Sequence, residues 1–470
     1  MASANAYPVK AFFASMLTRD IDLDDAILDL LDNCLDGVLR TLGDKHTAGA
    51  RPYAGFWARI EFDEDHFAIY DNCGGISRET ALNYAFLMGR PETPDVELPT
   101  VGAYGIGMKR ALFKLGERSQ VVSGTVEGFY TVNITPEWMK DDETWTLPLE
   151  DVERGNAANW LGPDEFGTGI DVRELYASTQ KRLGSPKFFD SFIANVQTHY
   201  AYILEKGFSV SVNGVSMRPV QTLFLYGPPV GAGRIAPFVY TGTIGSVNIS
   251  LIVGLYRQIV GEEELAAEAL ERRSADTSGW TLVCNDRVVL YNDKTLLTGW
   301  GETGIPAFHS QFIGIRGEVR FTSNNPLDLP LRTTKRGIDA SSEIYLQIKN
   351  IMREGMKMFI NYTNDWKGHN AEERTYSNSA TPLRVWDATQ KVTQTERPRH
   401  RENGEVYVPT LPRPKMTTSE TWIRFVRPVR EVNLVSNFLF DDDTPRKPGV
   451  VGDACFADVL ARAKRDGEDG

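Results

Sequence analysis

Cysteine, basic charge and long apolar runs are all scarce in this chain of 470 residues. The four cysteines are far apart and contain neither a CxxC pair nor the Cys/His spacing of a zinc site. Structural disulfides are therefore not expected, and a reduced, cytoplasmic setting is the simplest prediction. No run reaches the roughly 18 apolar residues of a membrane-spanning helix, and residues 1–10 lack the apolar core of a secretory signal. We expect no membrane partner.

The formal net charge of −12 argues against a protein covered with basic nucleic-acid-binding surface, although a local basic groove is compatible with it. The length allows about two to four domains with substantial cores. We expect three regions, with boundaries at 1–180, 181–365 and 366–470.

The first informative stretch, 26–38, reads AILDLLDNCLDGV. Its apolar residues recur with a helical period and form one broad face. Asp29, Asn33 and Asp36 are spaced i, i+4 and i+7, so they share another side of the same helix. Two carboxylates and a carboxamide on one stripe suit a hydrated magnesium ion and an oriented water. A solvated acidic face on an ordinary amphipathic helix is the alternative.

A second stretch follows a predicted hairpin of strands at 59–63 and 66–70, and reads DNCGG over 71–75. A carboxylate at the end of a strand can accept a hydrogen bond from an exocyclic amine, while the glycines let a flat ring approach the backbone. An ordinary Asp-Asn turn is the alternative. The Gly167-Thr168-Gly169 strand entry is a weaker signal of the same kind, with a plain turn as its alternative.

A third stretch, 102–109, reads GAYGIGMK and opens a predicted helix that continues to about residue 115. It does not match the P-loop pattern, and no βαβ context precedes it. Three glycines before a helix leave backbone N–H groups that can face an anion, and the helix dipole adds to this attraction. Lys109 places a cation where the dipole disfavours one, which points to an anionic ligand. Glycines that merely allow a tight turn are the alternative.

The remaining pattern predicts an α/β (α+β) fold with a largely antiparallel, mixed sheet rather than a Rossmann repeat. In the first region we expect a helix at 80–88 and strands at 119–123, 129–134, 144–148 and 169–174. Later we expect a helix at 187–204, a hairpin at Asn213-Gly214, strands at 237–240, 247–255, 281–290 and 311–321, an acidic helical insertion at 261–273 and a helix at 342–363. Residues 366–415 read as a partly extended arm with a basic cluster at 397–401, followed by a strand at 422–425 and a helix at 451–463.

The order and spacing of these motifs resemble the GHKL ATPases, which include the gyrase B subunit, heat-shock chaperone ATPases, histidine kinases, MutL and the MORC proteins. The stretch 29–37 is similar to the family's ExxxNxxDA helix, and 71–75 to its DxGxG turn. The stretch 102–109 resembles the ATP lid, most closely that of MORC proteins. The stretches 283–289 and 312–317 resemble the MORC and MutL transducer domain, whose loop supplies a lysine to the γ-phosphate, here Lys335. The resemblance covers roughly residues 10–360.

The resemblance implies a GHKL (Bergerat) sandwich of helices on a mixed sheet, an S5-like α/β transducer domain and a small C-terminal extension. It implies that ATP and Mg²⁺ bind, with Asn33 on the metal, Asp71 on the adenine amine, Gly75 close to the ring, Thr168 supporting Asp71, and Asp29 and Lys335 as catalytic residues. The implied phosphate loop comprises Gly102, Gly105, Gly107, Met108 and Lys109. Met88 packs either on the base or in the core.

Two departures from the family pattern matter. The water-activating glutamate is replaced by Asp29, whose side chain is shorter by about 1.5 Å. Because a general base must reach hydrogen-bond distance, we expect slow hydrolysis. Asp32 is a poorer substitute because it lies off the stripe formed by Asp29 and Asn33. In the turn, Cys73 takes the place of the first glycine, and we expect adenine binding to survive because Asp71 and Gly75 remain.

The implied function is that of a MORC-like or MutL-like ATPase, in which ATP orders the lid and stabilises a homodimer, giving an ATP-gated clamp that acts in DNA maintenance or defence. A chaperone or partner-remodelling ATPase that does not act on nucleic acid is the alternative. The C-terminal region would then contact DNA or a partner protein. A histidine kinase is a poor match, because no phospho-acceptor histidine helix precedes the motifs.

Overall fold

The computed structural model describes residues 9–43, 45, 49–87, 105–231, 233–260, 277–332, 337–414, 423, 425–440, 444 and 446–468. The chain forms a mixed α/β protein, as the sequence predicts. It divides into two compact units, Met1–Pro414 and Lys415–Gly470. The first unit contains two large sheets with separate hydrophobic cores and a small two-stranded sheet.

The first lobe, residues 9–216, is built on an eight-stranded sheet in the order β5-β4-β3-β6-β2-β1-β7-β8. All neighbouring strands are antiparallel except β1 and β7. The strands are β1 (Trp57–Phe62), β2 (Phe67–Asp71), β3 (Gly116–Thr125), β4 (Gly128–Ile134), β5 (Glu150–Val152), β6 (Gly167–Leu175), β7 (Ser209–Val212) and β8 (Val215–Ser216). The helices are α1 (Lys10–Thr18), α2 (Leu23–Leu42), α3 (Arg78–Thr80), α4 (Gly107–Leu115), α5 (Pro136–Lys140), α6 (Arg154–Ala157), α7 (Ala177–Leu183), α8 (Pro186–His199) and α9 (Ala201–Glu205), with a π-helical turn, η2, at Ala81–Ala85.

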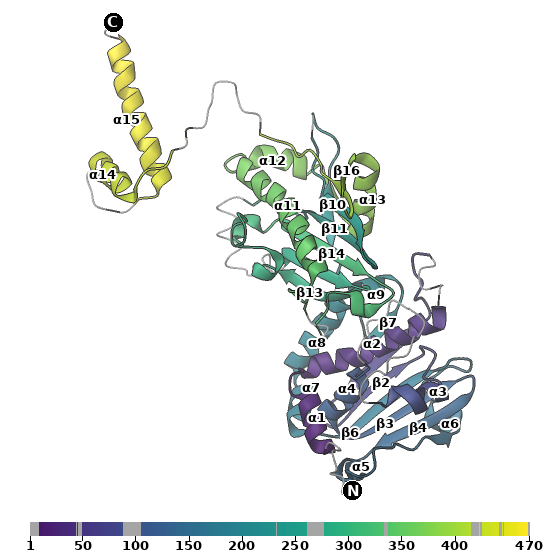
Figure 1. Ribbon diagram of the computed structural model, residues 1–470. Coiled ribbons are helices and arrows are strands. Elements are labelled where there is room, and N and C mark those ends of the chain that lie inside the picture. Colours follow the sequence, from purple (N-terminus) through teal and green to yellow (C-terminus); the bar gives the residue numbers. More distant parts are fainter. Residues whose placement is uncertain are drawn as a thin grey trace, which may run out of the picture. The chain divides into compact units, whose positions relative to one another are not determined.

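Helix α2 crosses the first lobe as its central helix (Figure 1). Acidic residues in its first turn and Arg40 in its last turn complement the helix dipole. The helix ends where Gly43 takes a positive φ of 52°. Fourteen of its 20 residues are buried, which is typical of a helix packed on several sides rather than on one face.

The second lobe, residues 223–411, contains a seven-stranded sheet in the order β13-β12-β14-β11-β10-β17-β16 and a two-stranded sheet of β15 and β9. Helix α11 lies along the larger sheet (Figure 1). The strands are β9 (Leu223–Tyr226), β10 (Phe238–Ile244), β11 (Val247–Leu255), β12 (Gly279–Cys284), β13 (Arg287–Asp293), β14 (Ile315–Thr322), β15 (Thr381–Arg384), β16 (Pro398–Arg401) and β17 (Gly404–Tyr407). The helices are α11 (Glu343–Asp365), α12 (Asn370–Ser377) and α13 (Val385–Thr395), with short 3₁₀ turns η4 (Leu296–Thr298), η5 (Ser310–Phe312) and η6 (Pro326–Asp328).

Most predicted elements are present, and the differences have local causes. The strand expected at 144–148 is absent; Thr144 instead offers its carbonyl oxygen to the buried ammonium of Lys10 at 2.5 Å. The strand expected at 281–290 is a hairpin, because Asn285 and Asp286 adopt positive φ values of 46° and 66° and turn the chain. The helix expected at 187–204 is divided at Tyr200 into α8 and α9.

The helix expected at 80–88 is shorter, with the π-helical turn η2 following α3. The arm expected at 366–415 is largely folded: α12, α13 and β15–β17 belong to the second lobe, and β17 pairs with β10. Its polar composition reflects exposed positions, because all four residues of β16 are exposed. The insertion expected at 261–273 lies outside the described residues.

The second compact unit contains helices α14 (Val429–Phe440) and α15 (Pro448–Glu468), which pack on each other. Helix α14 was not predicted, and α15 extends the helix expected at 451–463 at both ends. The strand expected at 422–425 falls partly outside the described residues, and Ile423 and Phe425 are not in a strand. Within the described part of the chain, no helix is long and apolar enough to cross a membrane.

Candidate functional site

The acidic stripe of α2 is not a solvated face. Its carboxylates, Asp29 and Asp36, are 3% and 6% exposed, and Asp32, which lies off the stripe, is 1% exposed. Burying three carboxylates on one helix is costly unless each has a partner. The partners of these side chains therefore decide what the helix does.

Asp71, at the end of β2, is buried and held by the main chain. Its Oδ1 accepts hydrogen bonds from the backbone N–H of Cys73 at 2.8 Å and of Thr168 at 3.2 Å. Burial raises the pKa of the Asp71 carboxyl, while these two donors and the thiol of Cys34 on α2 oppose that shift. The carboxylate is thereby fixed against its own sheet.

Glycines allow three backbone segments, the turn after Asp71, β3 and β6, to approach each other closely. Gly75 has a φ of +73°, and a Cβ there would lie 2.1 Å from the carbonyl oxygen of Gly124. A Cβ on Gly167 would lie 1.9 Å from the carbonyl oxygen of Asp71. Only glycine fits at these positions, so the turn, β3 and β6 meet without side chains between them.

Thr168 belongs to a short polar chain next to this turn. Its hydroxyl lies 2.9 Å from the hydroxyl of Ser123, which accepts a hydrogen bond from the N–H of Ile76 at 2.8 Å. Ser123 on β3 was not among the predicted site residues, because nothing in the local sequence marks it. The register between β3 and β6 pairs it with Thr168.

Helix α2 contacts the same turn directly. A Cβ on Gly37 would lie 2.8 Å from the carbonyl oxygen and 3.0 Å from the Cβ of Cys73. Thr41 donates a hydrogen bond to the Cys73 carbonyl oxygen at 3.2 Å. The turn at Cys73 therefore occupies space that Gly37 leaves on the helix, which gives a physical reason for glycine at position 37.

Helix α4 reaches the other end of the stripe. Its first residue, Gly107, lies against Asp29: a Cβ added to Gly107 would be 3.4 Å from the Cβ of Asp29, in van der Waals contact. Arg110 Nη2 donates to Asp29 Oδ2 in a buried ion pair. Ile106, before the helix, provides no side-chain cap for the first N–H groups of α4. The pairing of Asp29 with Arg110, 81 residues away, was not predicted.

Lys109 points into the protein in this structure. Its ammonium donates to the carbonyl oxygen of Ala85 at 2.9 Å and to that of Gly105. Burial lowers the pKa of Lys109 to about 8. Met108 is buried in the core of the first lobe, and Gly105 is exposed with a φ of +66°. Lys109 must therefore turn if its ammonium is to meet a phosphate.

The structure brings six predicted site residues into one place, which we call the α2 junction: Asp29, Asn33, Asp71, Gly75, Gly107 and Thr168. Three other predicted residues, Met88, Gly102 and Lys335, lie outside the described residues. Their predicted roles stay predictions.

Two polar groups at the junction are under-satisfied. No described residue hydrogen-bonds the partly buried side-chain amide of Asn33. Arg110 Nε is buried and has no hydrogen-bond partner among the described residues. No group of three or more His, Cys, Asp or Glu side chains in the described part of the chain is arranged to hold a metal ion. Asn33 is thus compatible with a magnesium ion whose other ligands are phosphates and water.

Asp32 faces away from the junction toward the second lobe. Its Oδ1 accepts a hydrogen bond from Arg287 Nε of β13 at 3.0 Å and contacts the hydroxyl of Tyr200. The Arg287 guanidinium lies over the Tyr200 ring, 4.3 Å from its centroid. We call Asp32, Tyr200 and Arg287 the seam cluster, because they join the two lobes.

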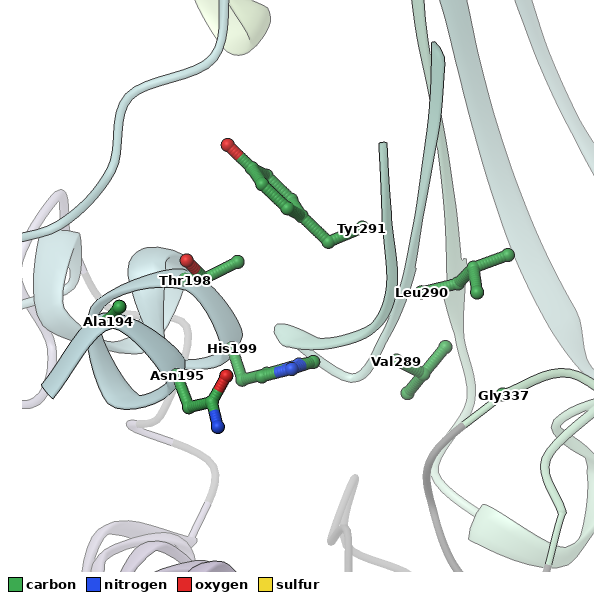
Figure 2. Close-up of a pocket in the computed structure, with 8 residues that line it drawn as sticks. All are labelled: Ala194, Asn195, Thr198, His199, Val289, Leu290, Tyr291 and Gly337. Carbon is green, nitrogen blue, oxygen red and sulfur yellow. The ribbon is translucent and has the colours of Figure 1, made fainter. Parts of the chain in front are cut away.

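A pocket lies elsewhere on the seam, between α8 and β13 (Figure 2). Its volume is about 420 Å³, and it is lined by Ala194, Asn195, Thr198, His199, Val289, Leu290, Tyr291 and Gly337. None of these residues is Lys or Arg, so the pocket offers a phosphate no permanently charged side chain. It contains none of the predicted site residues.

Comparison with known protein families finds no family model that matches this chain, and no curated protein sequence matches it.

Proposed function

We propose that the first lobe binds ATP with Mg²⁺ at the α2 junction and hydrolyses it slowly, as a GHKL-type ATPase with the Bergerat sandwich. The observation that carries this proposal is that three separate motifs meet at α2, two of them in direct contact with the helix and one through Asp71. The turn at Asp71 contacts Cys34 and Gly37 of the helix, Thr168 shares the Asp71 carboxylate, and Gly107 lies against Asp29. Motifs 97 residues apart in sequence meet around one buried carboxylate.

The base would bind at Asp71. A carboxylate held by two main-chain donors is a fixed acceptor for the amine of adenine. Gly75 would act indirectly, by letting the Asp71 turn pack on the backbone of β3, and the Thr168–Ser123 hydroxyls would support the same edge. Gly102, Gly105, Gly107, Met108 and Lys109 form the proposed phosphate loop, in which the first N–H groups of α4 would face the anion.

Hydrolysis would be an attack of water on the γ-phosphorus, with cleavage of the bond to the β–γ bridging oxygen. Asp29 would accept the proton of the attacking water, and Arg110 would hold the Asp29 carboxylate in place. Magnesium, held at Asn33 and the phosphates, would neutralise charge on the phosphate oxygens. Lys335 is proposed to supply a further positive charge at the γ-phosphate. The short Asp29 side chain, already paired with Arg110, favours slow turnover.

The second lobe is proposed to be an S5-like transducer, and the cycle to be that of an ATP-gated, homodimeric clamp. The exposed basic strand β16 favours DNA as the target, because Arg399 and His400 lie on an open sheet edge. A protein-remodelling ATPase remains the second candidate, favoured by the net charge of −12. DNA binding that weakens steeply with salt and requires the ATP analogue supports the first; no salt-sensitive binding in either state contradicts it.

The test of nucleotide binding uses titration calorimetry with Mg²⁺ and a non-hydrolysable ATP analogue. Asp71→Asn keeps one oxygen for the two backbone N–H groups but replaces the other with a donor. We expect affinity to fall about 10- to 100-fold. Asp171→Asn is the matched control, since this β6 carboxylate pairs with His66 at the sheet surface and should leave affinity unchanged. Equal affinities in all three proteins would exclude Asp71 as the base-binding residue.

Hydrolysis has its own test. Asp29→Asn should keep analogue affinity within about threefold and lower kcat by at least about 100-fold, because the general base is removed. Phosphate release under single-turnover conditions measures this. Undiminished turnover in the variant would remove Asp29 from the mechanism without affecting the binding proposal.

A further inference from the structure

The seam cluster lies on the helix that carries the proposed site. We propose that Arg287 is a positioning residue: through Asp32, it lets the second lobe set the position of α2 and therefore the rate of hydrolysis. This inference depends on the proposed function of the α2 junction. It gives the second lobe a role in turnover that is separate from any residue contacting the nucleotide.

The contact is fully enclosed. Asp32, Tyr200 and Arg287 are 1%, 0% and 2% exposed, respectively. Solvent cannot compensate for a lost partner in such a place, so the three groups keep one mutual arrangement. Arg287 is the first residue of β13, directly after the tight Asn285–Asp286 turn, which fixes where its side chain begins.

Asp32 is well placed to transmit a movement. It directly precedes Asn33, the proposed metal ligand, and is one helical turn from Asp29, the proposed base. The Tyr200 hydroxyl also lies 2.9 Å from the carbonyl oxygen of Leu28 and can donate its one proton either there or to Asp32, so the cluster contacts both a side chain and the backbone of α2. A shift of β13 would therefore turn or slide the part of α2 that bears Asp29.

A second arginine on the seam provides an internal comparison. Arg320 of β14 lies over the ring of Tyr202 in α9, 3.7 Å from its centroid, and bonds to Glu318 at 2.9 Å. Like Arg287, it joins an aromatic residue of the first lobe to a carboxylate. Its carboxylates, Glu318 and, at 3.9 Å, Asp286, however, belong to the second lobe, and none of its partners is on α2. Arg320 can thus stabilise the seam without holding the proposed site.

The experiment compares Arg287→Lys with Arg320→Lys in the full chain. Each variant keeps its charge but loses the planar guanidinium over the ring. We expect Arg287→Lys to lower kcat for ATP about tenfold or more while KM stays within about threefold, because the base is displaced rather than the binding contacts removed. Arg320→Lys should leave both constants within about twofold. Thermal unfolding of both variants reports the general loss of seam stability.

A second readout needs no nucleotide. Hydrogen exchange of peptides covering α2 should rise in Arg287→Lys and stay at the wild-type level in Arg320→Lys. Equal effects of the two variants on kcat and on exchange would overturn the inference while nucleotide binding by the wild type stands. A wild-type protein that binds no Mg²⁺–ATP analogue would instead overturn the proposed function, and the assigned role of Arg287 with it.

Where Arg287→Lys does not fold, the pair Asp32→Asn with Arg287→Gln removes both charges together. The same kcat loss at nearly constant KM supports the inference. Wild-type turnover in this folded double variant contradicts it, because the charged contact would then be dispensable for positioning.

Discussion

The α2 junction and the seam cluster are both buried and polar, but they hold their carboxylates in different ways. At the junction, Asp71 accepts from two backbone N–H groups and is surrounded by glycines. At the seam, Asp32 is bound by the side chains of Tyr200 and Arg287. One carboxylate is fixed by its own sheet, and the other is held by a residue of another lobe.

This difference suggests a division within the proposed site. The half that would recognise the base, around Asp71, is rigidly part of the first lobe. The half that would hold the metal and the water, on α2, also depends on the second lobe. Binding and turnover can therefore respond differently to the same movement.

The largest expected effect comes from removing the charge of only one partner of the buried Asp32–Arg287 ion pair. Arg287→Met leaves the buried Asp32 charge without its guanidinium and should lower the free energy of unfolding by about 3–5 kcal/mol. Adding Asp32→Asn removes both charges and should restore most of that loss. Asp71→Asn, whose main-chain donors keep an oxygen acceptor, should cost about 1 kcal/mol or less. Urea unfolding measures all three. Equal losses from Arg287→Met and Asp71→Asn would erase the distinction between the two regions.

A smaller effect is expected where α2 meets the Asp71 turn. Gly37→Ala places a Cβ 2.8 Å from the Cys73 carbonyl oxygen and 3.0 Å from its Cβ, so the helix and the turn must separate. We expect a loss of about 1–3 kcal/mol in unfolding free energy. Adding Cys73→Gly removes one of the two contacts and should restore part of it, measured as a double-mutant cycle. Strict additivity would contradict the proposed fit between Gly37 and Cys73.

The smallest effect concerns pH. Because burial lowers the pKa of Lys109 to about 8, the ligand-free protein loses this positive charge above pH 8. Affinity for the triphosphate should be constant below about pH 8 and fall up to about tenfold per unit above it. Lys109→Met should abolish that slope in calorimetry at pH 7, 8 and 9. The effect on folding has the opposite sign. Below pH 8 the cost of burying the charged ammonium lowers the free energy of unfolding, and this cost is relieved as the pH rises toward the higher pKa of Lys109 in the unfolded chain.

Local pattern was sufficient to predict the elements that carry the junction. The helical period around Asp29 and Asn33, and the Asp71 turn after a hairpin, are confirmed as structure. Contacts between distant residues were not predictable: Arg110 and Asp29, Ser123 and Thr168, and the seam pair come together only through strand order and lobe packing. Acidic residues recur with the same helical spacing whether their stripe is buried or solvated, so this spacing could not predict that the stripe of α2 is buried.

Strand β16 ends the larger sheet of the second lobe with Pro398, Arg399, His400 and Arg401, all exposed. A sheet edge normally offers unpaired backbone groups to any extended chain. Proline removes one N–H donor, while Arg401 and His400 are paired with Glu354 and Glu405. The missing donor and these charged pairs make β16 a poor template for edge-to-edge pairing with a second copy.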